Sequence, residues 1–143
     1  MNAKKSTRIT SLFLILALAF SLAGCGKTAE PEGVWTNATY TEDTEFGTGA
    51  NTVKVEISVL ENNVTFTINT GSETVGDALL ENGLIAGDES EYGLYIKVVN
   101  GITADYDVDQ SYWAFYINGE FAMTGVDSTD IDSNSVYKLE YTK

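Results

Sequence analysis

The side chains that most often carry enzymatic chemistry are scarce in this sequence. Its 143 residues include no histidine and one cysteine, against 21 aspartates and glutamates. Histidine is the usual general base of hydrolytic triads and the commonest zinc ligand. Carboxylates are so frequent in this chain that no single pair indicates a glycosidase site. We therefore expect a protein that is not an enzyme.

One group of carboxylates has a spacing that is used for metal binding. Asp105, Asp107 and Asp109 follow the one-three-five pattern of an EF-hand calcium loop. That loop also needs glycine at its sixth position and glutamate at its twelfth. This chain has Gln110 and Tyr116 there. We interpret the segment as a solvated acidic loop and assign no metal site.

The aromatic residues are more informative than the carboxylates. Residues 111–119 contain no charge and are rich in aromatic side chains, which favours a strand, and Asn118-Gly119 predicts a tight hairpin turn after it. Alternate side chains of this strand face opposite sides, with Trp113, Phe115 and Ile117 on one side and Tyr112, Ala114 and Tyr116 on the other. Because both sides are apolar, either protein covers both or one side contacts a ligand or a partner.

Tyrosine and tryptophan combine a flat apolar ring with a polar tip, which suits a ligand with a wide apolar face and a polar rim. The candidate ligand-binding residues are Tyr92, Tyr95, Tyr106, Tyr112, Trp113 and Tyr116, with Trp113 and Tyr112 foremost. The alternative for each is packing in the core or across a strand pair.

The start of the chain has the features of an export signal. Three basic residues precede an apolar run over residues 11–22, which is too short to span a bilayer. The tetrapeptide Leu22-Ala23-Gly24-Cys25 resembles the lipobox of bacterial lipoproteins. That resemblance implies cleavage after residue 24 and lipidation of Cys25, and therefore an extracytoplasmic protein anchored to the bacterial cell membrane. An ordinary secretory signal with an incidental cysteine is the alternative.

Cleavage after residue 24 would make an acidic chain more acidic. It removes Lys4, Lys5 and Arg8, which leaves 5 of the 8 basic residues against 21 acidic ones and a net charge of −16. Such a charge repels phosphate backbones, so we expect no nucleic-acid partner. Attachment to the membrane would then depend on the lipid.

Three segments follow from these patterns. Residues 1–24 form the signal peptide, residues 25–50 the lipidated N-terminus with a flexible linker, and residues 51–143 the folded domain. The linker holds the sole proline and no periodic apolar pattern, although Val34-Trp35 and Thr39-Tyr40 could add an edge strand. The stretch 42–49 is too polar and rich in glycine to predict a strand.

Periodicity within the domain predicts an α+β arrangement. Alternating apolar residues predict a hairpin over 52–68, and a capping box at Thr74 to Asp77 predicts a short helix that ends at Asn82-Gly83. Further strands are expected at 92–99, 112–117 and 136–142, with an acidic loop at 88–91 and irregular chain at 102–110. One helix would lie on one face of a single mixed sheet.

These elements resemble the C-terminal β-grasp domain of the vitamin B12 carriers transcobalamin and intrinsic factor, which a set of small bacterial lipoproteins shares. The matching segments are residues 74–80, 92–96, 100–101, 112–119, 125–126 and 136–142. The resemblance implies a β-grasp-like mixed sheet with one short helix packed on one face. It also implies a corrinoid, that is a cobalamin-like molecule, as a bound ligand.

Two functions of different classes follow as expectations. The first is an extracytoplasmic, membrane-anchored ligand-binding lipoprotein that captures a corrinoid for a membrane transporter. The second is a surface protein-interaction module, without a small-molecule ligand, whose aromatic hairpin docks on a partner protein. Apart from the corrinoid as a ligand, we expect no cofactor.

Overall fold

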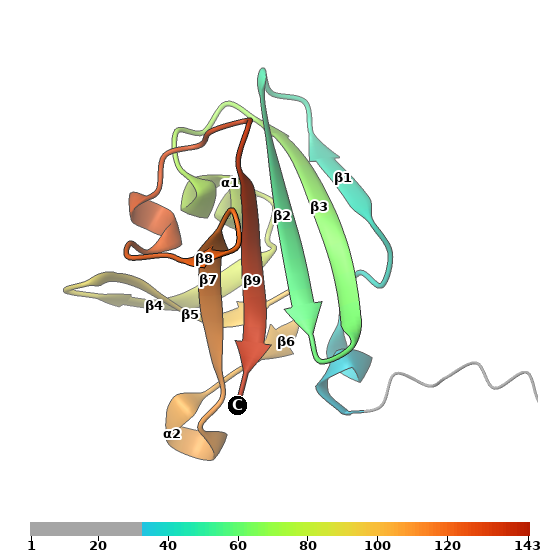
Figure 1. The fold of residues 1–143 in the computed structure, drawn as a ribbon, viewed down its shortest axis with the longest axis vertical. Helices are drawn as coiled ribbons and strands as arrows, with labels where there is room; N and C mark the ends of the chain where they lie inside the picture. Colours follow the sequence, from blue (N-terminus) through green and yellow to red (C-terminus); the bar gives the residue numbers. More distant parts are fainter. Residues whose placement is uncertain (1–32) are drawn as a thin grey trace, which may run out of the picture.

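The computed structural model describes residues 33–143, which form two sheets with short helices around them (Figure 1). The predicted signal peptide, the lipidation site Cys25 and residues 26–32 of the predicted linker lie outside the described residues. Within residues 33–143, no helix is long and apolar enough to cross a membrane.

The larger sheet has six strands in the order β1-β3-β2-β9-β7-β8. Their bounds are β1 Thr44–Gly47, β2 Asn51–Val59, β3 Asn62–Thr70, β7 Tyr112–Ile117, β8 Glu120–Phe121 and β9 Val136–Thr142. Two antiparallel hairpins, β2–β3 and β7–β8, make up most of this sheet. The strand β9 lies between them, parallel to β2 and antiparallel to β7.

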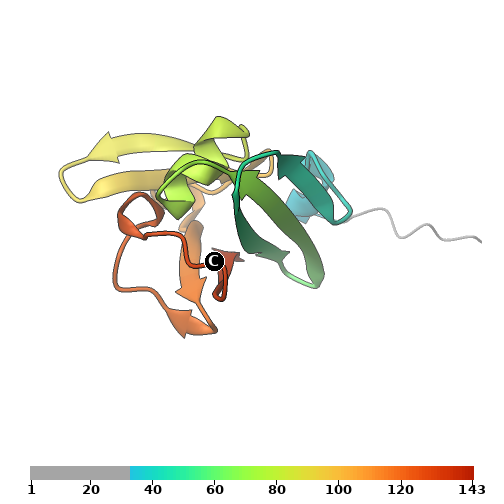
Figure 2. The same ribbon diagram turned by 90° about the horizontal axis from the view of Figure 1, so that it is seen from above.

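The smaller sheet has three strands in the order β4-β5-β6. Its strands are β4 Ile85–Ser90, β5 Gly93–Val99 and β6 Ile102–Thr103, and the helices are η1 Gly33–Asn37, α1 Val75–Glu81, α2 Tyr106–Asp109 and η2 Val126–Ser128. Figure 2 shows α1 and the β4–β5 hairpin on the same side of the larger sheet.

The core follows from the alternation in the β2–β3 hairpin. The inward side chains of both strands are almost fully buried: Val53, Val55, Ile57, Val59, Val64, Phe66 and Ile68. From α1, Val75, Ala78 and Leu79 are buried in the same cluster. Burial of each large apolar side chain contributes about 1.5–3 kcal/mol, so a helix of seven residues is stable here because of this packing.

Several local predictions are confirmed. The Thr74 side chain accepts a hydrogen bond from the Asp77 amide at 3.1 Å, which caps α1, and Gly83 has a φ of +65° just after the helix. Asn118 and Gly119 have φ values of +51° and +84°, as the predicted hairpin turn requires. The α+β class is confirmed in its coarse form, mixed sheets with short helices, while the β-grasp assignment stays a prediction.

Other predictions were wrong. Residues 33–143 form two sheets and two α-helices where one of each was expected. The expected strand at 92–99 pairs with β4 in a separate sheet, and the stretch 102–110, expected to be irregular, forms β6 and α2. The expected acidic loop at 88–91 contains the end of β4, whose residues Ala86 to Ser90 are all exposed. A strand without a buried face has no apolar alternation, so the sequence pattern could not indicate it.

The edge strand of the larger sheet is also not where it was expected. The polar stretch 42–49 contains β1, which pairs in parallel with β3, whereas Val34-Trp35 lies in η1. Polar side chains hold this edge: Asp43 accepts from the Thr65 amide at 2.7 Å, and Glu45 accepts from the Asn69 amide group at 2.7 Å. Hydrogen bonds of this kind leave no hydrophobic signature.

Asn100 joins the segment before β1 to the smaller sheet. Its side chain accepts from the Tyr40 amide and donates to the Tyr40 carbonyl, both at 2.8 Å, and its own carbonyl accepts from the Thr39 amide at 2.8 Å. A Cβ at the next residue, Gly101, would lie 2.5 Å from the Thr39 hydroxyl. Residues 33–50 are therefore ordered by specific contacts, and Trp35 is buried in the core, which a flexible linker would not show.

We expect Asn100→Gly to destabilise the domain by about 1–3 kcal/mol, because it leaves the partly buried amide and carbonyl of Tyr40 without their partners. Glycine tolerates the φ of +52° at this position, so the change adds no backbone strain. Denaturant unfolding measures the difference, with the exposed Asn63→Ala as the control. Equal stability of the two variants would contradict this role of Asn100.

Candidate ligand-binding site

Three of the six predicted aromatic residues line one hollow. Tyr95, Tyr106 and Tyr112, together with Asp107, surround a volume of about 550 Å³ that is open to solvent. The tyrosines expose 42%, 57% and 37% of their surface, respectively. The ring centres of Tyr106 and Tyr112 are 6.5 Å apart, and their planes are inclined at 62°. These rings therefore present exposed aromatic surface in two directions.

The position of each tyrosine at the hollow follows from the strand or helix that carries it. On β5, Leu94 and Ile96 pack against the core, so Tyr95 between them points to the other side. Tyr112 begins β7 and is paired with Thr142 of β9. Tyr106 is the first residue of α2, which precedes β7 in the chain.

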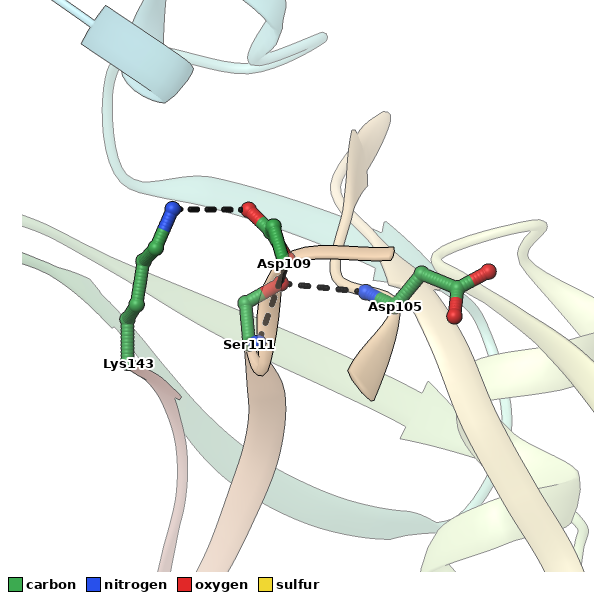
Figure 3. A network of polar contacts seen from close by, with 4 residues as sticks. All are labelled: Asp105, Asp109, Ser111 and Lys143. Carbon is green, nitrogen blue, oxygen red and sulfur yellow. Dashed lines mark hydrogen bonds and ion pairs between the residues drawn. The ribbon is translucent and has the colours of Figure 1, made fainter. Parts of the chain in front are cut away.

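A polar network holds α2 in place (Figure 3). The Asp105 carboxylate accepts from the Asp107 amide at 3.0 Å and caps the helix, while the Asp105 amide donates to the Ser111 hydroxyl at 3.0 Å. The Asp109 carboxylate accepts from both the amide and the hydroxyl of Ser111, and from Lys143 Nζ at 3.0 Å. Both ends of α2 are thus bonded to Ser111, just before β7, and its C-terminal end also to Lys143, just after β9, which restrains the position of Tyr106.

The network also changes the acidity of Asp109. The hydrogen bond from the Ser111 side chain, followed by that from Lys143, lowers the pKa of Asp109 from its ordinary value of 3.8 to about 2. Both bonds favour the charged carboxylate.

Two of the three carboxylates of the EF-hand-like segment are occupied by these hydrogen bonds. Asp105 caps α2, and Asp109 binds Ser111 and Lys143. Within residues 33–143, no group of three histidine, cysteine, aspartate or glutamate residues could hold a metal ion.

The other three predicted residues lie elsewhere. Trp113 is 8% exposed and packs in the core, edge-on to Tyr141 with ring centres 5.6 Å apart. Tyr92 lies in the turn between β4 and β5 and is 89% exposed. Tyr116 contacts Phe121 and the Lys138 ammonium on the outer side of β7.

The position of Trp113 corrects the sequence interpretation, which placed it foremost among the candidates. Residues 113 and 115 share one face of β7, and that face packs in the core cluster. The two faces of this strand are equally apolar in sequence, so alternation alone could not decide between them. Asp107, which lines the hollow, was interpreted only as part of a solvated loop.

Comparisons with known proteins give a family and two similar structures. Residues 72–143 match the family model described as "Domain of unknown function (DUF4430)". A crystal structure of a "putative metal binding protein" from Ruminococcus gnavus ATCC 29149 is 26% identical, with a TM-score of 0.61, over 65% of this chain and 97% of that one. Haptocorrin in complex with Cbi is 22% identical, with a TM-score of 0.45, over 65% of this chain and 25% of that one. No curated protein matches the chain.

We expect Ser111→Ala to raise the pKa of Asp109 from about 2 towards 3.8, and by more than Lys143→Met does, because the Ser111 bond is the larger cause. Carboxyl NMR shifts followed against pH measure both values.

The lowered pKa of Asp109 also predicts how the stability of the domain depends on pH. Because the folded-state pKa is depressed, the stabilisation by charged Asp109 is present above about pH 4 and is lost as pH falls towards about 2. The difference in unfolding free energy between wild type and Asp109→Asn should shrink over that range. A difference that is constant with pH would contradict the network.

Proposed function

The chain belongs to the DUF4430 family, and on that premise we propose that it is an extracytoplasmic, membrane-anchored lipoprotein that binds a ligand and catalyses no reaction. The observation that carries the proposal is the hollow lined by Tyr95, Tyr106 and Tyr112. Three partly exposed rings from three separate elements converge there, and α2 is held rigidly by its network. Pre-positioned aromatic rings of this kind lower the entropic cost of ligand binding.

A corrinoid is the first ligand to test. Its wide, flat and largely apolar face can stack on tyrosine rings, and the amides at its rim can bond to tyrosine hydroxyls. An open hollow of about 550 Å³ would cover part of such a ligand and leave the rest accessible. That arrangement suits a protein that passes its ligand on to a membrane transporter.

The proposed anchor would keep the domain close to the membrane. Seven residues separate Cys25 from Gly33, the first described residue. A chain of that length spans at most about 25 Å when fully extended. The hollow would then stay within reach of a transporter in the same membrane.

A second function is supported by a different surface. The β7–β8 hairpin, the chain just after it and the start of β9 expose Phe121, Met123 and Val136 by 62%, 95% and 47%, respectively. Tyr116 lies beside Phe121, with ring centres 5.7 Å apart. Neighbouring exposed apolar side chains of this kind are typical of protein-binding surfaces, so docking of this hairpin on a partner protein is the alternative.

Titration calorimetry with cobalamin and cobinamide tests the first function. The mature chain would carry Cys25→Ser so that it stays soluble. We expect saturable 1:1 binding, weakened about tenfold or more by Tyr106→Ala, which corresponds to about 1.4 kcal/mol. Tyr92→Ala is the matched control, because Tyr92 is exposed and does not line the hollow.

Absence of binding to both corrinoids would contradict a corrinoid carrier. Binding that survives Tyr106→Ala and is lost in Phe121→Ser would move the site to the hairpin surface.

The anchor has its own test. Wild-type protein expressed in a bacterium should have Cys25 as its N-terminal residue, carry the mass of a diacylglyceryl group and fractionate with membranes. Cys25→Ala should lack the added mass and leave the membrane fraction. An unmodified Cys25 thiol in the secreted wild type would instead indicate an ordinary secretory signal.

A further inference from the structure

We infer that the hollow selects a positively charged organic ligand, one that presents an alkylated ammonium group to Tyr95, Tyr106, Tyr112 and Asp107. The inference rests on the proposed ligand-binding function and assigns a chemical class to the ligand of that site. It draws on the kind of side chains that line the hollow and on the balance of charges around it.

The lining of the hollow has the chemistry of a cation site. The face of a tyrosine ring carries partial negative charge and attracts cations, and clusters of aromatic rings recognise quaternary ammonium groups. Three of the four lining residues are tyrosines, and the fourth is an aspartate. Tyr106 and Tyr112 meet edge-on, inclined at 62°, so their faces are not stacked against each other.

The neighbouring charges leave Asp107 available. Lys97 pairs with Asp88 at 2.7 Å, and Lys143 pairs with Asp109 at 3.0 Å. Among the ion pairs of residues 33–143, none includes Asp107. The nearby lysines therefore pair with other carboxylates, and the Asp107 carboxylate lines the hollow without a direct ion-pair partner among residues 33–143.

The electrostatic field around the hollow is also negative. The pKa of Lys97 is raised, first by its hydrogen bond to Asp88 and then, to a smaller extent, by the charges of Asp105 and Asp107. The chain as a whole has a net charge of −13. Such a field favours cations and opposes anionic ligands.

At another place in the structure, a tyrosine ring and a carboxylate already hold a cation. On the outer side of the larger sheet, Lys138 Nζ lies 4.7 Å from the centre of the Tyr116 ring and pairs with Glu140. There a tyrosine and a carboxylate together hold an ammonium group of the protein. The hollow offers three tyrosines and one carboxylate, and no lysine is among its lining residues.

Choline and its neutral analogue 3,3-dimethylbutan-1-ol test the inference, since they share a shape and differ in charge. NMR shift titrations of the full mature chain with Cys25→Ser would give both affinities. We expect choline to bind at least about fivefold more tightly than the alcohol, and added salt to weaken choline alone.

Three variants locate the effect. Asp107→Asn should remove most of the preference for choline and leave the affinity for the alcohol unchanged. Asp77→Asn removes the same charge from α1, at a residue that does not line the hollow, and should preserve the preference. Tyr106→Leu should weaken choline, because leucine keeps apolar bulk without an aromatic face.

Equal affinities for the two probes, or equal effects of Asp107→Asn and Asp77→Asn, would overturn the inference. Binding of neutral cyanocobalamin at the tyrosines without a preference for choline would sustain the proposed function and overturn this inference alone. Binding of choline without a corrinoid would sustain the inference and overturn the corrinoid. Absence of binding by every probe would overturn both.

Discussion

The pairing of β9 with both β2 and β7 is the interaction on which the rest of the domain depends. The two hairpins of the larger sheet have no direct pairing, so β9 alone joins them. Tyr137 and Leu139 on β9 are fully buried, and the Tyr137 hydroxyl is satisfied by the Asp132 amide and the Asp130 carbonyl. The end of β9 also positions residues of the hollow, since Thr142 is paired with Tyr112 and Lys143 binds Asp109 at the end of α2. The strand β9 therefore both joins the two hairpins of the larger sheet and helps to position the residues of the candidate site.

The fold could be predicted wherever a segment has one buried face. The β2–β3 hairpin and α1 show clear periodicity, because their inward residues are buried and their outward residues are not. The strands β1 and β4 lie at sheet edges and are held by backbone pairing and polar side chains, so their sequences resemble loops. In the sequence, Asn100 stood out only within the segment 100–101 that matches the carrier domain. Its bonds to Tyr40, 60 residues away, depend on tertiary structure that no local pattern encodes.

The sequence indicated which residue types line the candidate site, but only some of their positions. Aromatic enrichment indicated tyrosines, and Tyr95, Tyr106 and Tyr112 do converge. Which face of β7 is buried depends on the core that it meets, so Trp113 could not be assigned from sequence. The contribution of Asp107 was hidden among other acidic residues, since only the fold shows that Lys97 and Lys143 pair with different carboxylates.

The central claim is that three tyrosines form one ligand-binding surface. The most direct measurement is an NMR spectrum of the protein with ¹³C-labelled tyrosine rings, recorded as cobinamide or choline is added. The account predicts saturable shifts at Tyr95, Tyr106 and Tyr112, with the buried Tyr137 and the distant Tyr116 unchanged. Shifts centred on Tyr116, or an unchanged spectrum with both ligands at saturating concentration, would contradict it.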